Sequence, residues 1–194
     1  GILANNEVED AWLDEGFTSF QDAWYMAHTY PPHGIDLEHS HRYDDFQKKY
    51  WKFLGERNNV QWTIIRLMAS RHNEPIDTKS HLAGGPSVYG LNAYTKPHMM
   101  LYSLRYLLGG ETFDSAMRSY YDRWKLKHTS EDRFRQAMEE TSGENLDWFF
   151  EQWLHQASYN DYALSDWWWE KRGNETYDLS LRIKRKGGMR YPLD

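Results

Sequence analysis

Two adjacent carboxylates, Asp14 and Glu15, lie within an apolar and aromatic segment near the beginning of the 194-residue chain. The segment reads Trp12-Leu13-Asp14-Glu15-Gly16-Phe17. Carboxylates at a helix start complement the helix dipole, but they also bind metal ions and act as general acids or bases. Adjacent side chains point about 100° apart on a helix, so this pair is a poor match for a glycosidase that uses two facing carboxylates. The helix-dipole role and a role in chemistry both stay open at this point.

Other chemistry-bearing residues favour ordinary structural roles. His39-Ser40-His41 offers two imidazoles to a metal ion, but histidines two positions apart in a polar stretch are typical of solvated surface. Trp167-Trp168-Trp169 suits carbohydrate stacking, yet its place at the end of the helical region favours a role at a domain junction. Asn174-Glu175-Thr176 is an acceptor sequence for N-glycosylation, which matters only in a secreted eukaryotic protein.

The elements that must position these residues are mostly helices. Apolar residues recur with the helical period from Asp14 to His28 and from His39 to Gly55, and Pro31-Pro32 closes the first segment. Residues 73–90 are rich in turn formers and predict a long loop, which often carries function. The later helices are predicted from their first and last residues. One has Pro97 in its first turn and ends at Gly109-Gly110, and the next covers Phe113–Trp124. A third begins at Thr129–Asp132 and ends at Ser142-Gly143, and a fourth covers Leu146–Leu154 with Asn145 as its N-cap.

The pattern changes near the end of the chain. Polar residues alternate with apolar ones at Tyr177, Leu179, Leu181 and Ile183, which predicts a strand, and Gly187-Gly188 is predicted to be the hairpin turn after it. An isolated hairpin is only marginally stable. The chain is therefore predicted to be mainly α-helical over residues 1–170, with residues 171–194 as the start of a β-domain.

Composition excludes several classes of function. Lys plus Arg number 23 against 29 Asp plus Glu, giving a net charge of −6 and a pI near 5.8. This argues against nucleic acid as a partner, because no cationic surface is available to drive counterion release. The absence of Cys excludes disulfides, thiolate metal sites and a cysteine nucleophile. No apolar run approaches the roughly 20 residues needed to span a bilayer.

The run Trp12–Phe17 resembles the Trp-Leu-Asn-Glu-Gly-Phe motif of the zinc aminopeptidases related to aminopeptidase N, the gluzincin metallopeptidases. The run Asn92–Lys96 is similar to the family's Tyr-x-Lys segment, although the usual Tyr-Glu-Lys-Gly is Tyr-Thr-Lys-Pro here. The runs Leu146–Trp153 and Tyr177–Asp194 resemble the end of the catalytic domain and the entry into a small β-sandwich. The implied fold is therefore the C-terminal helical part of a thermolysin-like catalytic domain, followed by the first strands of a β-sandwich.

The resemblance implies a zinc-dependent metallo-aminopeptidase that releases N-terminal residues from peptides. Glu15 would be the third Zn²⁺ ligand. Tyr94 would stabilise the oxyanion, which suits a phenol because it donates a hydrogen bond while staying neutral at pH 7; the alternative is a buried tyrosine bonded to backbone. Asp10, five residues before Glu15, would orient a zinc-binding His, with helix capping as the alternative. His98, one turn after Tyr94, is placed to line the same cleft, but a packed helix histidine is the more typical role.

The family's zinc site reads HExxH, then 18 residues, then Glu, and no HExxH occurs in this sequence. Counting back from Glu15 places the second His five positions before Gly1. The chain is therefore expected to be a fragment that begins after this motif and that, with one zinc ligand of three, has no peptidase activity by itself. The rival hypothesis is a catalytically inactive relative that acts as a peptide-binding or scaffold module. The residues do not indicate an oligomeric state or a compartment.

Overall fold

The computed structural model describes residues 2–30, 65 and 73–193. The chain divides into two compact units, residues 1–156 and 157–194. The first unit is helical and the second holds a two-stranded antiparallel sheet. The predicted class, mainly α-helical with strands at the end, is confirmed. The boundary expected between residues 170 and 171 lies inside the first strand, whereas the two units divide after Gln156.

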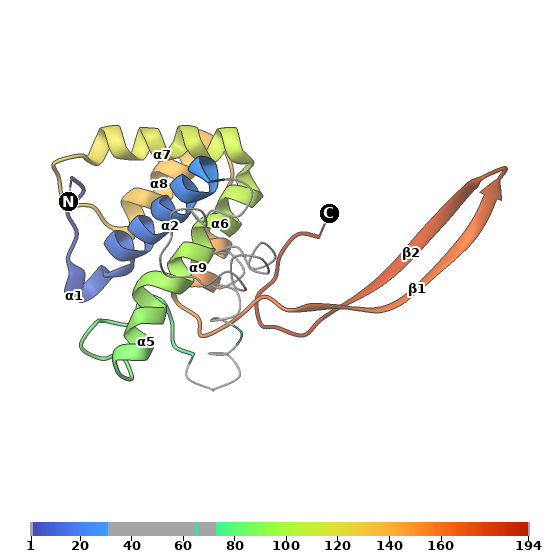
Figure 1. The fold of residues 1–194 in the computed structure, drawn as a ribbon, viewed down its shortest axis with the longest axis horizontal. Coiled ribbons are helices and arrows are strands. Elements are labelled where there is room, and N and C mark those ends of the chain that lie inside the picture. The colour runs from blue at the N-terminus through green and yellow to red at the C-terminus, as the bar shows by residue number, and fades with distance from the viewer. Residues whose placement is uncertain (1, 31–64, 66–72, 194) are drawn as a thin grey trace, which may run out of the picture. The chain divides into compact units, whose positions relative to one another are not determined.

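The helices of the first unit match most of the predicted segments (Figure 1). The segment predicted from Asp14 to His28 is the long helix α2. The helix predicted over His39–Gly55, the histidines within it and the closing prolines lie outside the described residues. The elements in chain order are α1 (Glu7–Asp10), α2 (Trp12–Thr29), α5 (Pro86–Gly90), the π-helical turn η2 (Leu91–Thr95), α6 (Lys96–Leu108), α7 (Gly110–Trp124), α8 (Glu131–Ser142) and α9 (Asp147–Leu154).

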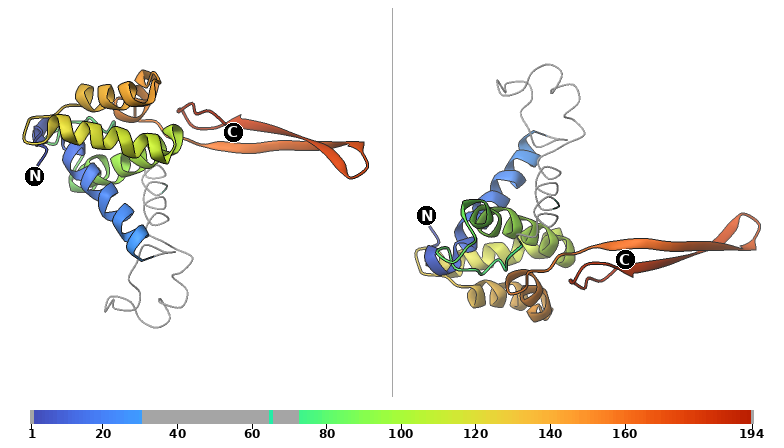
Figure 2. Two further views of the ribbon diagram at one scale, coloured as in Figure 1. Left: turned by 90° about the horizontal axis from the view of Figure 1, so that it is seen from above. Right: turned by 90° about the horizontal axis from the view of Figure 1, so that it is seen from below.

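An aromatic core joins α2 to the later helices. The ring of Phe134 on α8 is buried and lies edge-on to Phe17 of α2 at 4.9 Å, Tyr120 of α7 at 5.1 Å and Phe150 of α9 at 5.8 Å between centroids. Edge-to-face contacts of this kind stabilise beyond the area they bury. The buried Tyr120 hydroxyl is hydrogen-bonded to Thr129 Oγ1 at 2.6 Å. Helices α7 and α8 consequently lie side by side (Figure 2), and the core determines which face of α2 turns inward.

The end of the predicted loop is helical. Pro86 is the first residue of α5, a position where proline loses no hydrogen bond, and the helix runs on through η2 into α6. The prediction that residues 73–90 form a loop is therefore wrong for Pro86–Gly90, because Pro86 starts a helix. Pro97 does lie at the beginning of α6, as predicted, but α6 continues an existing helix.

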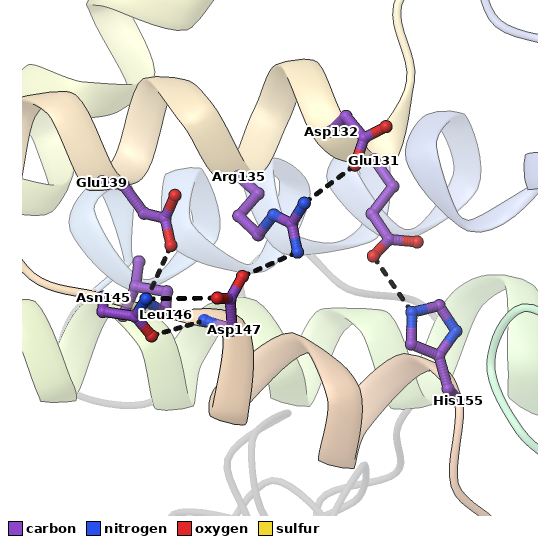
Figure 3. A network of polar contacts seen from close by, with 8 residues as sticks. All are labelled: Glu131, Asp132, Arg135, Glu139, Asn145, Leu146, Asp147 and His155. Carbon is purple, nitrogen blue, oxygen red and sulfur yellow. Dashed lines mark hydrogen bonds and ion pairs between the residues drawn. The ribbon is translucent and has the colours of Figure 1, made fainter.

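The N-cap of α9 is one position later than predicted. Leu146 occupies the cap position, its N–H donates to Glu139 Oε1 at 2.8 Å, and the Asn145 side chain accepts from the Asp147 N–H at 3.3 Å (Figure 3). Arg135 on α8 reaches both Asp132 and Asp147 at 2.9 Å. These polar contacts join α8 to the beginning of α9.

The second unit is a hairpin of β1 (Tyr162–Gly173) and β2 (Thr176–Arg185). The strand predicted at Tyr177–Ile183 is confirmed as part of β2. The prediction that Gly187-Gly188 is the hairpin turn is wrong, because Asn174-Glu175 connects the strands, with Glu175 at a φ of 67°. Gly187 instead passes close to the Tyr159 carbonyl, where a side chain would collide with the backbone. Trp167, Trp168 and Trp169 lie within β1. The sequence pattern did not predict this strand.

One face of the hairpin is apolar and exposed. Trp167 pairs with Leu181 and Trp169 with Leu179, while Trp168 pairs with Ser180 on the opposite face. An irregularity between Leu164 and Asp166 brings Leu164 to the same face as Trp167. The side chains of this apolar face are between 43% and 62% exposed: Leu164, Trp167, Trp169, Tyr177, Leu179, Leu181 and Ile183. Exposed apolar patches of this extent mark surfaces that bind another surface.

None of the helices in the described ranges combines the length and the apolar character needed to cross a bilayer.

His155 joins three parts of the first unit. Its Nδ1 lies 2.7 Å from Asp77 Oδ2, and its Nε2 lies 3.1 Å from Glu131 Oε1 at the beginning of α8 (Figure 3 draws the contact with Glu131). An imidazole donates from both nitrogens only when it is protonated. Burial lowers the pKa of His155, but the hydrogen bond with Asp77 and the negative charges of Glu131 and Asp77 outweigh it, so the pKa is raised above 6.5.

This arrangement predicts a pH-dependent stability. A raised pKa in the folded state means that the contribution of His155 is complete below its unfolded pKa of about 6.5 and is lost as pH rises through the folded value. Replacing His155→Gln should therefore lower Tm more at about pH 5.5 than at about pH 8.5. Thermal unfolding followed by circular dichroism measures both differences. Equal losses at the two pH values would show that protonated His155 does not stabilise the fold.

Candidate functional site

The structure brings together Glu15 and Tyr94, which are 79 positions apart in the sequence. The Tyr94 hydroxyl donates a hydrogen bond to Glu15 Oε1 at 2.5 Å. Glu15 is half-buried in the first turn of α2, and Tyr94 is 38% exposed on η2. The contact joins a carboxylate to a neutral donor at a surface that solvent and small molecules can reach.

The rotation of α2 about its axis explains why Glu15 faces η2. Trp12, Phe17 and Phe20 are buried on the inner side of the helix, and Phe20 packs against Phe113 at 5.7 Å. These contacts leave Glu15 at the edge of the buried face. Asp14, the adjacent carboxylate, shares no hydrogen bond with Tyr94 among the described residues. Of the two carboxylates, Glu15 is therefore the one bonded to Tyr94.

Tyr94 is held in its protonated form. The hydrogen bond to Glu15, followed by burial and the negative charge of Glu15, raises the pKa of Tyr94 to about 12. The phenol therefore remains a hydrogen-bond donor at all physiological pH values. Its ring also lies edge-on to Tyr89, with centroids 6.4 Å apart. The alternative of a buried tyrosine bonded to backbone does not describe this residue, because its partner is a carboxylate and its side chain is exposed.

Asp10 lies outside this pair, at the end of α1. Burial raises the pKa of Asp10, Glu9 and Asp77 add to the shift, and Lys79 opposes it. The first turn of α2 has no side-chain cap, and the cap of α1 is Asn6, which accepts from the Val8 N–H at 3.2 Å. Asp10 therefore does not cap either helix. Within the described part of the chain no donor reaches its carboxylate.

A buried lysine network beneath Tyr94 was not predicted. Lys96 is 3% exposed, and its ammonium donates to the Glu74 carbonyl and to Asn92 Oδ1, the latter at 3.4 Å. The Glu74 carboxylate accepts from the Gly84 N–H at 3.1 Å and from Asn92 Nδ2 at 3.5 Å. Burial lowers the pKa of Lys96 to about 8, against the opposing charges of Glu74 and Asp77. The network fastens the loop from residue 73 to residue 85 onto η2.

The sequence shows Lys96 but does not indicate that it is buried or that Glu74 is its partner. Lys96 lies two positions after Tyr94, and lysine is rarely buried unless its charge is compensated. Which groups compensate it depends on the path of the loop, since Glu74 is 22 positions away. The same loop also reaches α1, where Lys79 forms an ion pair with Glu9 at 2.6 Å.

His98 is a packed helix histidine. It is 4% exposed, it stacks on Tyr102 with centroids 5.1 Å apart, and it lies edge-on to Phe20 at 6.4 Å. Burial lowers the pKa of His98 to about 4, with Asp22 opposing the shift. His98 is therefore neutral at physiological pH and contributes mainly to packing.

The described residues do not contain a complete metal site. Across residues 2–30, 65 and 73–193, no group of three or more His, Cys, Asp or Glu side chains could hold a metal ion. Glu15 offers one carboxylate, and its second oxygen, Oε2, has no hydrogen-bond partner in the same ranges. The histidines of His39-Ser40-His41 lie outside them. A metal at Glu15 would need at least two further ligands.

Comparison with known proteins identifies the family. A model of the peptidase family M1 domain matches residues 2–153, more than half of the chain. The chain therefore belongs to peptidase family M1, as the motif around Glu15 suggested. It is 29% identical over 152 residues to the aminopeptidase N of Lactococcus lactis subsp. lactis, a match that covers 78% of this chain and 16% of that protein. The chain thus spans a small part of the length of this relative.

The lysine network predicts a loss of stability when its donor is removed. Lys96→Met keeps most of the side-chain volume but leaves the Glu74 carbonyl and Asn92 Oδ1 without their donor, which should lower the free energy of unfolding by about 1–3 kcal/mol. Denaturant unfolding measures this loss. The exposed Lys125→Met, which breaks a surface ion pair with Asp122, should change the stability much less, because solvent screens the pair. Equal effects of the two substitutions would contradict a structural role for Lys96.

Proposed function

We propose that this chain contributes part of the active site of a zinc-dependent metallo-aminopeptidase. The observation that supports the proposal most directly is the 2.5 Å hydrogen bond between Tyr94 and Glu15. By the resemblance of their motifs, Tyr94 would be the oxyanion donor and Glu15 a zinc ligand. Membership of peptidase family M1 supports peptidase chemistry, and the name of the relative supports release of N-terminal residues.

Glu15 fits the role of a zinc ligand in its chemistry and exposure. A half-buried carboxylate with one oxygen unpartnered among the described residues can bind Zn²⁺ without first losing all its hydrogen bonds. The two remaining ligands would be the histidines of an HExxH motif preceding Gly1, which Glu15 would join as the third protein ligand. Zinc, when bound, lowers the pKa of water and polarises the scissile carbonyl. One ligand of three does not hold the metal, so the 194 residues alone are expected to be inactive.

Tyr94 would stabilise the oxyanion that forms at the scissile carbonyl. Its hydroxyl lies beside the carboxylate that would hold the metal, and a phenol is ordinarily neutral at pH 7. A phenol has one O–H, so this proton would turn from Glu15 to the substrate oxygen, and the new hydrogen bond would strengthen as negative charge develops there. Peptides would reach it because Tyr94 is partly exposed.

Asp10 would act as a positioning residue. Its carboxylate is half-buried and has no donor among the described residues, and burial raises its pKa. A half-buried acceptor of this kind suits the N–H of a zinc-binding His, whose ring orientation it would determine.

The exposed apolar face of the hairpin would be the inner face of one sheet of a β-sandwich. Seven large apolar side chains on one face of a two-stranded ribbon are unfavourable in water. In a sandwich they would pack against a second sheet. This proposal accounts for the alternation of apolar and polar residues along β2 from Tyr177 to Lys184.

The role of Glu15 predicts the metal content of the full-length protein. Glu15→Gln should abolish zinc retention, because an amide is a much weaker ligand than a carboxylate. Plasma emission spectrometry after gel filtration measures the bound metal. Asp14→Asn changes the neighbouring carboxylate in the same way and should retain the native amount of zinc. A Glu15→Gln variant that keeps its zinc would rule out Glu15 as a ligand.

The role of Tyr94 predicts a loss of rate without a loss of metal. Tyr94→Phe should keep the zinc of the full-length protein and reduce kcat by about 10²–10³, the usual effect of removing one oxyanion donor. Hydrolysis of aminoacyl nitroanilides measures the rate. Tyr89→Phe removes a hydroxyl from the adjacent ring and serves as the matched control. Unchanged turnover in Tyr94→Phe would contradict the oxyanion role.

A further inference from the structure

Gly16 lies where α2 meets the helix that carries Tyr94. A Cβ atom at Gly16 would overlap Pro97 Cβ, and it would lie 3.1 Å from Pro97 Cγ and 3.4 Å from the Ala93 carbonyl oxygen. The obstacle is a buried, rigid proline ring and not the end of a flexible side chain. Any side chain at position 16 would therefore have to push the two helices apart.

This contact lies next to both members of the Glu15–Tyr94 pair. Gly16 directly follows Glu15, and Ala93 directly precedes Tyr94. Both helices are rigid around the contact, because Phe17 is packed in the aromatic core and Lys96 is fixed by Glu74. A change in the separation of the helices at Gly16 would consequently change the 2.5 Å distance between Glu15 Oε1 and the Tyr94 hydroxyl.

Pro97 also shapes the backbone that carries Tyr94. Proline has no N–H, so Pro97 cannot donate the helical hydrogen bond to the carbonyl four positions earlier, which is that of Ala93. The proline ring also clashes with that carbonyl in a regular α-helix. The preceding turn is π-helical, with the Lys96 N–H bonded to the Leu91 carbonyl. One extra residue in a turn rotates the side chains before it by about 100° relative to those after it. The Ala93 carbonyl that Pro97 displaces from the ladder is the one that lies beside Gly16.

We propose that the contact between Gly16 and Pro97 is the positioning element that sets the distance and direction of Tyr94 relative to Glu15. The inference rests on the proposed function, since it assigns these residues a role in placing the oxyanion donor beside the metal ligand. Gly16 and Pro97 touch neither metal nor substrate in this role. They act through the backbones of α2 and η2.

The first test introduces a methyl group at the contact in the full-length protein. Gly16→Ala should lower kcat at least about tenfold, because displacement of a catalytic group by about 1 Å can cost up to 10²-fold. It should also lower Tm through overpacking. Gly90→Ala is the matched control, since a Cβ at helical Gly90 meets nothing within 4 Å. That variant should keep its rate and should not lose stability.

The second test relieves the collision. Pro97→Gly removes both ring atoms that a methyl at position 16 would meet, whereas Pro97→Ala keeps Cβ, the nearer of the two. In the protein prepared without zinc, Gly16→Ala should therefore lower Tm much less in the Pro97→Gly background than in the Pro97→Ala background. This measurement is independent of activity. Equal losses of Tm in the two backgrounds would overturn the proposed contact.

The third test separates positioning of Tyr94 from a general structural role. If Gly16 acts through Tyr94, then Gly16→Ala should lower kcat in the native background but not further in the Tyr94→Phe background. The same fold loss in both backgrounds would overturn the inference while leaving the function of Tyr94 intact. A Tyr94→Phe variant with native kcat would instead contradict the proposed function itself, so the two failures are distinguishable.

Discussion

The packing of α2 against the helix formed by α5, η2 and α6 determines where both candidate catalytic side chains lie. Glu15 is on the first of these helices and Tyr94 is on the second. The two backbones come so close at Gly16 that no side chain fits between them. The aromatic core around Phe134 also holds α2, through Phe17. The site is therefore a property of one helix packing, and the remaining helices and loops support that packing.

Polar groups beside this packing are placed to keep the site rigid. The ammonium of Lys96 lies at the base of the π-helical turn and fastens the loop from residue 73 to residue 85 to it. The same loop contacts α1 through Lys79 and the end of α9 through Asp77 and His155. Of these charged groups Lys96 is buried, and a buried charge is costly unless it is hydrogen-bonded. The loop that supplies an acceptor to Lys96 is consequently held against η2, which carries Tyr94.

Membership of peptidase family M1 gives these local features a common interpretation. The match to the family ends at Trp153, close to the end of the helical unit at Gln156. In the proposed site the chain would contribute one carboxylate and one phenol. The matched relative is about six times longer than the matched segment. In the proposed enzyme, zinc would thus be held between this helical unit and a segment that carries the two histidines. The precision of such a site depends on how rigidly each segment holds its own ligands.

The sequence by itself determined the family, the positions of Glu15 and Tyr94 and most of the helices, because helical periods, caps and a short motif are local patterns. It did not determine that Pro86 starts a helix, that Asn174-Glu175 forms the hairpin turn or that Gly187-Gly188 passes close to another segment. Glycine and proline serve in turns, helix starts and close contacts alike, and only their neighbours in space distinguish these uses. The hydrogen bond between Tyr94 and Glu15, the compensation of Lys96 by Glu74 and the close contact of Gly16 with Pro97 were likewise decided by the tertiary structure. Each joins residues more than twenty positions apart, whose approach depends on how the helices pack.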